Sequence, residues 1–138
     1  MKRFYLDTSI WRDYFEDRRD SLRPLGEFAF RFLKNCGNHR CEVLYSCLVV
    51  QELRSFYSEE AIKGIFLPFI NFLKEVPISG KQISEAGKIS FSVQGTHIKD
   101  ALHAILARDN EAVMVTRDRH FDALADFVEV AKPEDIYF

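Results

Sequence analysis

The chain has 138 residues, of which 47% are hydrophobic, and this suits one domain with a proper core rather than two comparable ones. Its formal net charge of −2 at pH 7 excludes binding to nucleic acid through bulk positive charge, so any such contact must be local. No apolar run approaches the ~20 residues that span a bilayer, and the Met-Lys-Arg start leads into a stretch too short and polar for a signal peptide. We therefore expect a single domain over residues 1–138, located in the cytoplasm.

The first half of the chain predicts strands at residues 2–6 and 42–46. Between them, Thr8 or Ser9 can cap a helix that reaches about residue 18, and apolar residues recur at helical spacing over residues 25–33. A further helix begins at Ser46 or Cys47 and carries Glu52 in its early turns.

The second half continues the alternation. We expect a helix over residues 61–73 with a bend near Pro68, further helices over 82–91 and 98–108, a helical turn over 122–125, and strands over 76–78, 112–116 and 127–130. Such alternation favours an α/β fold, a three-layer α/β/α sandwich with a central, mainly parallel sheet.

Three cysteines, Cys36, Cys41 and Cys47, lie in or beside a predicted buried strand. Their odd number argues against a disulfide framework, and we expect reduced thiols in the core. A zinc site that includes His39 is the alternative, but the spacing of these residues matches no common zinc-ligand pattern.

Four acidic residues stand where the predicted chain passes from a strand, or from the turn after it, into a helix: Asp7, Glu52, Asp100 and Asp118. A parallel sheet would bring Asp7 and Asp118 to the same edge, because both follow strands. Open α/β sheets bind ligands at that edge. Taken singly, each acid is also explained by helix capping or turn formation.

Several carboxylates at one edge repel one another and have raised pKa values unless a cation neutralises them. Hard oxygen ligands select Mg²⁺ or Mn²⁺ over zinc. The sequence therefore predicts a Mg²⁺ or Mn²⁺ site that can act on a phosphodiester.

Two hydroxyl residues, Ser9 and Thr116, lie two positions from an acid and can orient a carboxylate or a metal-bound water. Helix capping and strand-end packing are their structural alternatives. Four cations near the same edge either contact phosphates or are merely solvated: Arg12, Lys99, Arg117 and Arg119.

Other residues near the acids have less distinct roles. His103 lies on the flank of its helix that carries Asp100, and a position in solvent is favoured over one in the cleft. For Trp11 and Phe15, core packing is favoured over base stacking. Asp122 lies close enough in sequence to Asp118 to share or replace its role.

These segments together resemble a PIN domain, and most closely the small toxin ribonucleases of the VapC type from toxin–antitoxin pairs. The resemblance spans essentially the whole chain and rests on the order and spacing of four motifs: Phe4-Tyr-Leu-Asp7-Thr-Ser-Ile10, Ser46-Cys-Leu-Val-Val-Gln-Glu52-Leu53, Lys99-Asp100-Ala-Leu-His-Ala104 and Val115-Thr116-Arg-Asp118-Arg-His-Phe121. Residues 58–91 match no motif of the family.

The resemblance implies a parallel sheet between helices, with Asp7, Glu52, Asp100 and Asp118 at the family's four acidic positions and Ser9 and Thr116 at its accompanying hydroxyls. It also implies one or two Mg²⁺ or Mn²⁺ ions that activate water against an RNA phosphodiester, leaving a 5′-phosphate and a 3′-hydroxyl. A homodimer and a cognate antitoxin protein are the partners that it implies besides RNA.

Three other readings of the acidic residues remain. A phosphatase of the aspartyl-phosphate type would require a second Asp at the position of Ser9, and a receiver domain would require an acidic pair near the end of the first strand; neither is present. A non-catalytic PIN-like module that binds RNA or protein is the third. Metal-dependent cleavage distinguishes it from an enzyme.

Overall fold

The computed structural model describes residues 1–138, and a five-stranded parallel sheet forms its centre. The strand order is β3-β2-β1-β4-β5. The strands are β1 (Arg3–Leu6), β2 (Glu42–Tyr45), β3 (Leu73–Glu75), β4 (Val113–Val115) and β5 (Val130–Ala131). Because all pairings are parallel, every strand delivers its carboxyl end to the same edge of the sheet.

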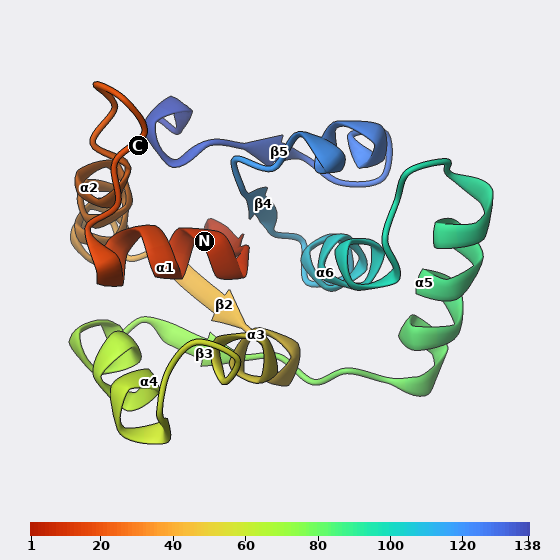
Figure 1. Ribbon diagram of the computed structural model, residues 1–138, viewed down its shortest axis with the longest axis horizontal. Helices are drawn as coiled ribbons and strands as arrows, with labels where there is room; N and C mark the ends of the chain where they lie inside the picture. Colours follow the sequence, from red (N-terminus) through yellow and green to blue (C-terminus); the bar gives the residue numbers. More distant parts are fainter.

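Helices complete the three-layer α/β/α sandwich that the alternation predicted. Figure 1 shows α2 and α4 on one side of the strands and α5 and α6 on the other. The helices are α1 (Thr8–Glu16), α2 (Leu25–Asn38), α3 (Cys47–Leu53), α4 (Glu59–Phe66), α5 (Gly80–Ser92) and α6 (Ile98–Asp109), with 3₁₀ turns η1 (Leu67–Phe69), η2 (Arg119–Leu124) and η3 (Pro133–Asp135). None of the helices is both long and apolar enough to span a lipid bilayer.

The central strand β1 is buried on both faces, as parallel strands between helices are. Phe4, Tyr5 and Leu6 are all fully or almost fully buried, and the ring of Phe4 meets that of Phe32 on α2 edge-on at 5.1 Å. Trp11 on α1 is also completely buried. This confirms core packing for Trp11. The same prediction is wrong for Phe15, which is 42% exposed and contacts Tyr57 ring to ring.

The third strand lies three residues earlier than predicted, at Leu73–Glu75 instead of residues 76–78. The predicted helix over 61–73 ends at Phe66, and η1 with Pro68 follows, which frees the next residues to pair with β2. The amide of Val76 still donates to the carbonyl of Tyr45. Pro77 has no amide hydrogen, and the strand stops before it.

The cysteines divide between two environments. Cys36 and Cys41 belong to the main core cluster, as expected, and burial raises the pKa of both thiols. Cys47, at the start of α3, is exposed, so the expectation of a core thiol is wrong at that position. All three thiols are free.

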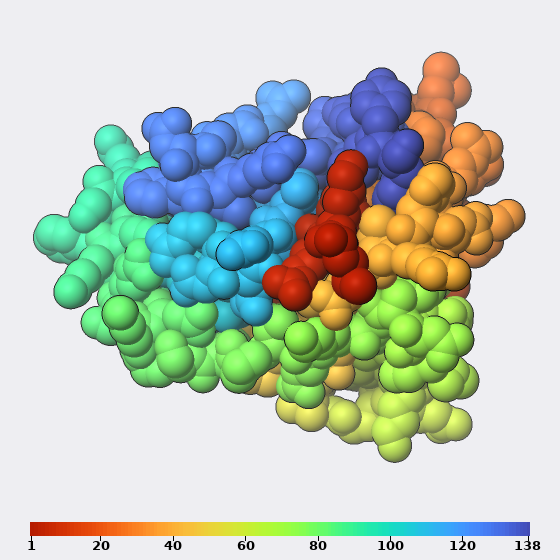
Figure 2. Space-filling model, turned by 180° about the vertical axis from the view of Figure 1, so that it is seen from behind, coloured from red at the N-terminus to blue at the C-terminus, as the bar shows by residue number.

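The two ends of the chain meet at the edge of the sheet where the strands begin. The ammonium of Lys2 donates to the carbonyl of Tyr137 at 3.3 Å. Figure 2 shows the first residues, in red, lying beside the C-terminal segment, in dark blue. This edge is opposite the one at which the parallel strands end.

Candidate active site

The structure brings the four predicted acids to the carboxyl ends of the strands. Asp7 directly follows β1, Asp118 lies three residues after β4, and Glu52 is on α3, which follows β2. Asp100 is in the first turn of α6 and approaches from the helical layer. Their mutual influence is visible in the raised pKa of Asp100, caused first by burial and then by the charges of Asp118 and Asp7.

Asp7 is held by hydrogen bonds from two hydroxyls. Its Oδ2 accepts hydrogen bonds from Ser9 Oγ at 2.9 Å and from Thr116 Oγ1 at 3.0 Å. The residue is only 9% exposed, and this burial raises the pKa of its carboxyl. Asp7 itself is the N-cap residue of α1, not Thr8 or Ser9 as predicted, and makes no side-chain capping bond.

Thr116 connects two of the acids. Its hydroxyl donates to Asp7 and accepts a hydrogen bond from the backbone amide of Asp118 at 3.0 Å. Asp118 Oδ1 in turn accepts from the amide of His120 at 2.9 Å, and the imidazole Nδ1 of His120 lies 3.1 Å away. Ligand atoms of Asp100, Asp118 and His120 all lie within 4.8 Å of one another. His120 is thus an additional candidate ligand that sequence reasoning did not single out.

Glu52 is held in a different way, by a hydroxyl and an imidazole. Its Oε1 accepts from Thr8 Oγ1 at 2.7 Å and bonds to His103 Nε2 at 2.6 Å. Burial favours a raised pKa for this carboxyl, but the hydrogen bonds from His103 and Thr8 outweigh it, and the pKa of Glu52 falls below its usual value. Glu52 is therefore an ionised carboxylate at neutral pH.

His103 is only 1% exposed, so the prediction that it faces solvent is wrong. Below Glu52 its Nδ1 bonds to the Tyr5 hydroxyl at 2.8 Å, and that hydroxyl bonds to Ser46 Oγ at 2.7 Å. Sequence reasoning missed Tyr5, Ser46 and Thr8. One signal could have identified Tyr5. It lies two residues before Asp7, and residues two apart in an extended chain point to the same face.

The acids share a pattern that matters for metal binding. Asp7, Glu52 and Asp118 each have one oxygen held by protein donors and one that receives no protein hydrogen bond: Asp7 Oδ1, Glu52 Oε2 and Asp118 Oδ2. The carboxylate of Asp100 receives none at either oxygen. Such a set of free, hard oxygens fits Mg²⁺ or Mn²⁺, which prefer carboxylates and water as ligands.

Two of the four predicted phosphate-contacting cations are already paired. Arg117 makes two hydrogen bonds of 2.7 Å to Glu134, and Arg12 bonds to Glu16 and lies 3.6 Å above the Phe56 ring. Lys99 and Arg119 are exposed and lie beside Asp100 and Asp118. They are the cations of the predicted four that remain available to a phosphate.

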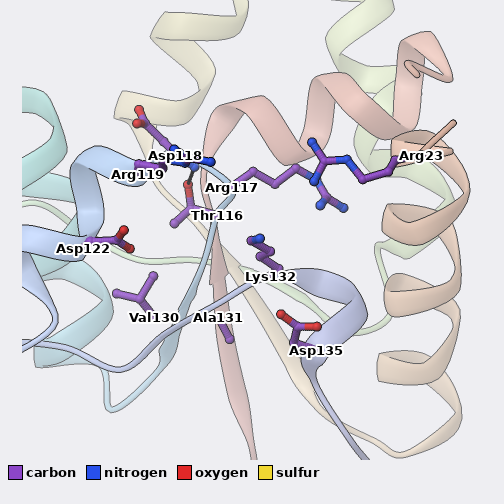
Figure 3. A pocket seen from close by; sticks show the side chains of 10 residues that line it. All are labelled: Arg23, Thr116, Arg117, Asp118, Arg119, Asp122, Val130, Ala131, Lys132 and Asp135. Atoms are coloured by element: carbon purple, nitrogen blue, oxygen red, sulfur yellow. Dashed lines mark hydrogen bonds between the residues drawn. The ribbon is translucent and has the colours of Figure 1, made fainter. Parts of the chain in front are cut away.

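A polar pocket of about 330 Å³ adjoins Asp118 and Thr116. Figure 3 shows Asp118 and Arg119 at one end, with the long side chain of Arg117 directed towards Arg23. Lys132 and the exposed Asp122 also line it. Asp122 lines the same pocket as Asp118 and, like Asp7 and Glu52, is outside the group that Asp100, Asp118 and His120 form.

The sheet order, the covering helices and the acidic edge define an α/β protein with a candidate divalent-cation site at the ends of its strands. The PIN domain model matches residues 4–127, and the chain belongs to the PIN domain family. No curated protein sequence matches the chain.

Solved structures agree on the fold. The chain resembles VapBC2 from Rickettsia felis with a TM-score of 0.70 and 16% identity, over 94% of this chain and 98% of that one. It resembles FitAcB from Neisseria gonorrhoeae with a TM-score of 0.65 and 18% identity, over 96% of this chain and 99% of that one. A toxin–antitoxin complex from Klebsiella pneumoniae is similar with a TM-score of 0.64 and 17% identity, again over 96% of this chain and 99% of that one.

Proposed function

We propose that this protein is a Mg²⁺- or Mn²⁺-dependent endoribonuclease and the toxin of a toxin–antitoxin pair. The observation that carries the proposal is the convergence of four acids at one sheet edge, three of them with one oxygen held and one left free. Membership of the PIN family supports a nuclease, and the toxin–antitoxin complexes among the similar structures support the biological role.

In this proposal Asp7, Glu52, Asp100 and Asp118 hold the cation. When bound, the cation lowers the pKa of a water and neutralises charge that develops on the phosphate. Ser9 and Thr116 orient Asp7, since both donate to its Oδ2 and leave Oδ1 for the cation. The expected products are a 5′-phosphate and a 3′-hydroxyl.

The partners follow from the same proposal. RNA lies along the acidic edge, where Lys99 and Arg119 are exposed, and the pocket beside Asp118 receives the flanking part of the strand. A cognate antitoxin is proposed because the similar structures include a toxin–antitoxin complex, and a homodimer is proposed because the resemblance to toxins of the VapC type implies one. A non-catalytic module that binds RNA or protein is the alternative.

The test is cleavage of a panel of structured and single-stranded RNAs by protein freed of any copurifying partner, with Mg²⁺, Mn²⁺ or EDTA. We expect cleavage that requires the cation and falls at least 100-fold in Asp7→Asn, the order of magnitude for loss of an essential catalytic interaction. Asp126→Asn removes an exposed carboxylate that is not one of the proposed site residues. It is the charge-matched control and should cleave as the wild type does.

Absence of cleavage in either metal, from protein that is folded and partner-free, would support the binding module instead. Cleavage that persists at the wild-type rate in Asp7→Asn would show that the proposed site is wrong.

A further inference from the structure

A buried chain of hydrogen bonds leads from the core to the candidate site. It passes from Ser46 Oγ to Tyr5 Oη at 2.7 Å, from Tyr5 Oη to His103 Nδ1 at 2.8 Å, and from His103 Nε2 to Glu52 Oε1 at 2.6 Å. Ser46 and Tyr5 have no exposed surface, and His103 is 1% exposed. Only the last member, Glu52, reaches the cleft, with 24% of its side chain exposed.

Every side chain in this series of hydrogen bonds has a hydrogen-bond partner. Leaving a buried polar group without a partner is destabilising, whereas here each hydroxyl and each ring nitrogen has a partner. Since an ionised Glu52 only accepts hydrogen bonds, His103 Nε2 carries the hydrogen and donates it. With a neutral imidazole, Nδ1 then accepts from the Tyr5 hydroxyl, and Ser46 donates to Tyr5.

His103 is engaged at both nitrogens, which excludes it as a cation ligand or as a group that contacts substrate. Its effect reaches the cleft only through Glu52. Thr8 reinforces that effect, because its hydroxyl donates to the same oxygen, Oε1. The carboxylate therefore has one oxygen fixed by two donors and the other, Oε2, free of protein hydrogen bonds.

We propose that His103 is a positioning residue, which, supported by Tyr5 and Ser46, fixes the Glu52 carboxylate so that Oε2 is presented to a divalent cation. The inference rests on the proposed function in one respect, that Glu52 is a cation ligand.

The experiment measures Mn²⁺ affinity directly, by calorimetry and by electron paramagnetic resonance of free Mn²⁺, without RNA. In His103→Leu we expect the affinity to fall about 10- to 100-fold, the usual effect of losing a partner that orients a metal ligand. His103→Gln should recover most of it, because the Gln amide can donate to Glu52 Oε1. His39→Leu, a histidine beside Phe138 at the opposite edge, is the matched control and should bind Mn²⁺ as the wild type does.

A second measurement separates positioning from general damage. In a Glu52→Gln background, His103→Leu should cause no further loss of Mn²⁺ affinity, because its effect passes through that carboxylate. In RNA cleavage, the Mg²⁺ concentration for half-maximal rate should rise while the RNA concentration for half-maximal rate stays the same.

The outcomes that overturn the proposal are distinct from those that overturn the proposed function. A folded His103→Leu that binds Mn²⁺ as the wild type does, or one that only lowers the melting temperature, shows a purely structural role. If His103→Leu does not fold, Tyr5→Phe replaces it, because it keeps the buried ring and removes only the hydroxyl behind His103; unchanged Mn²⁺ affinity there also overturns the proposal. If the wild-type protein binds no Mn²⁺, the proposed function itself is refuted.

Discussion

Asp7 is the only one of the four acids that is buried. Two hydroxyls donate to one of its oxygens, while burial opposes its negative charge and raises the pKa of its carboxyl. A nearby cation removes this conflict, because it stabilises the ionised form without removing the hydrogen bonds. Without a cation, the same carboxylate is a source of instability.

Replacement of Asp7 by Asn should therefore separate stability from cation binding. In EDTA we expect Asp7→Asn to be more stable than the wild type by roughly 1 kcal/mol, the ordinary size of a single-site effect, because the buried charge is removed. With cation at a hundred times its dissociation constant, the wild type should gain about 2.7 kcal/mol, and the variant distinctly less. Urea unfolding in EDTA and in Mn²⁺ measures both.

The opposite result is informative as well. An equal gain from Mn²⁺ in both proteins would mean that Asp7 is not a ligand. Asp126→Asn, at an exposed position, serves as the control and should change neither value.

For single residues, the sequence predicted the acids and their hydroxyl partners. It did not predict the buried residues that hydrogen-bond to Glu52 and support it. Ser9 and Thr116 could be placed because they lie two positions from an acid. His103 could not, since a helical wheel shows which residues share a flank but not which flank faces the sheet. On α6, Ala101, His103 and Leu106 are all buried, and because they point in different directions around the helix, α6 is packed on more than one side.

At the scale of the elements, α2 packs tightly at Gly26 against the C-terminal end of α1. A Cβ at this position would lie 2.6 Å from the Asp17 Cα and 2.7 Å from the Asp13 carbonyl oxygen. Both neighbours are backbone atoms, which cannot move independently of the helix. The absence of a side chain at Gly26 thus sets how α2 lies against the helix that starts at Asp7.

Two glycine substitutions should consequently have opposite effects. Gly26→Ala should destabilise the protein by about 1–3 kcal/mol, the range for overpacking, because its Cβ overlaps backbone. Gly64→Ala, in the interior of α4 with open space around it, should stabilise it by about 0.5–1 kcal/mol. Chemical denaturation of both variants beside the wild type tests the pair, and a neutral Gly26→Ala would contradict the close approach of α1 and α2.

Element types were predicted better than their boundaries. The strand and helix order was correct, because periodicity depends on many residues at once. The third strand was misplaced by three residues and the last strand starts at Val130 rather than residue 127, because short strands are defined by the neighbour they bond to. For example, the amide of Thr116 bonds to the carbonyl of Ala131, a pairing that local sequence does not reveal.

The whole molecule carries almost no net charge, −2 at pH 7, so under the proposed function the attraction to RNA comes from a few local cations. Arg117 and Arg12 are occupied by Glu134 and Glu16. Lys99, Arg119 and Lys132 are exposed near the acidic edge and the pocket beside it. Two or three phosphate contacts are the number that this distribution supports.

Salt should therefore weaken RNA binding only moderately. With about −0.7 per phosphate contact on a single strand, the logarithm of affinity should fall against the logarithm of salt concentration with a slope of about −1.4 to −2.1. Fluorescence anisotropy on the non-cleaving Asp7→Asn variant measures it. Arg119→Gln should make the slope shallower by about 0.7, whereas Arg40→Gln, at the opposite edge, should leave it unchanged. A slope several times steeper would indicate a more extended basic surface.

The hydrogen bonds to Asp7 and Glu52 also determine when conformational entropy is lost. Immobilising a rotamer-rich side chain at a binding site costs about 0.5–1.5 kcal/mol. Here Ser9 and Thr116 hold one carboxylate, and Thr8 and His103 hold the other, in the protein alone. Folding has therefore already restricted the rotation of these two carboxylates. Binding of a cation at this edge of the sheet would lose little additional side-chain entropy there.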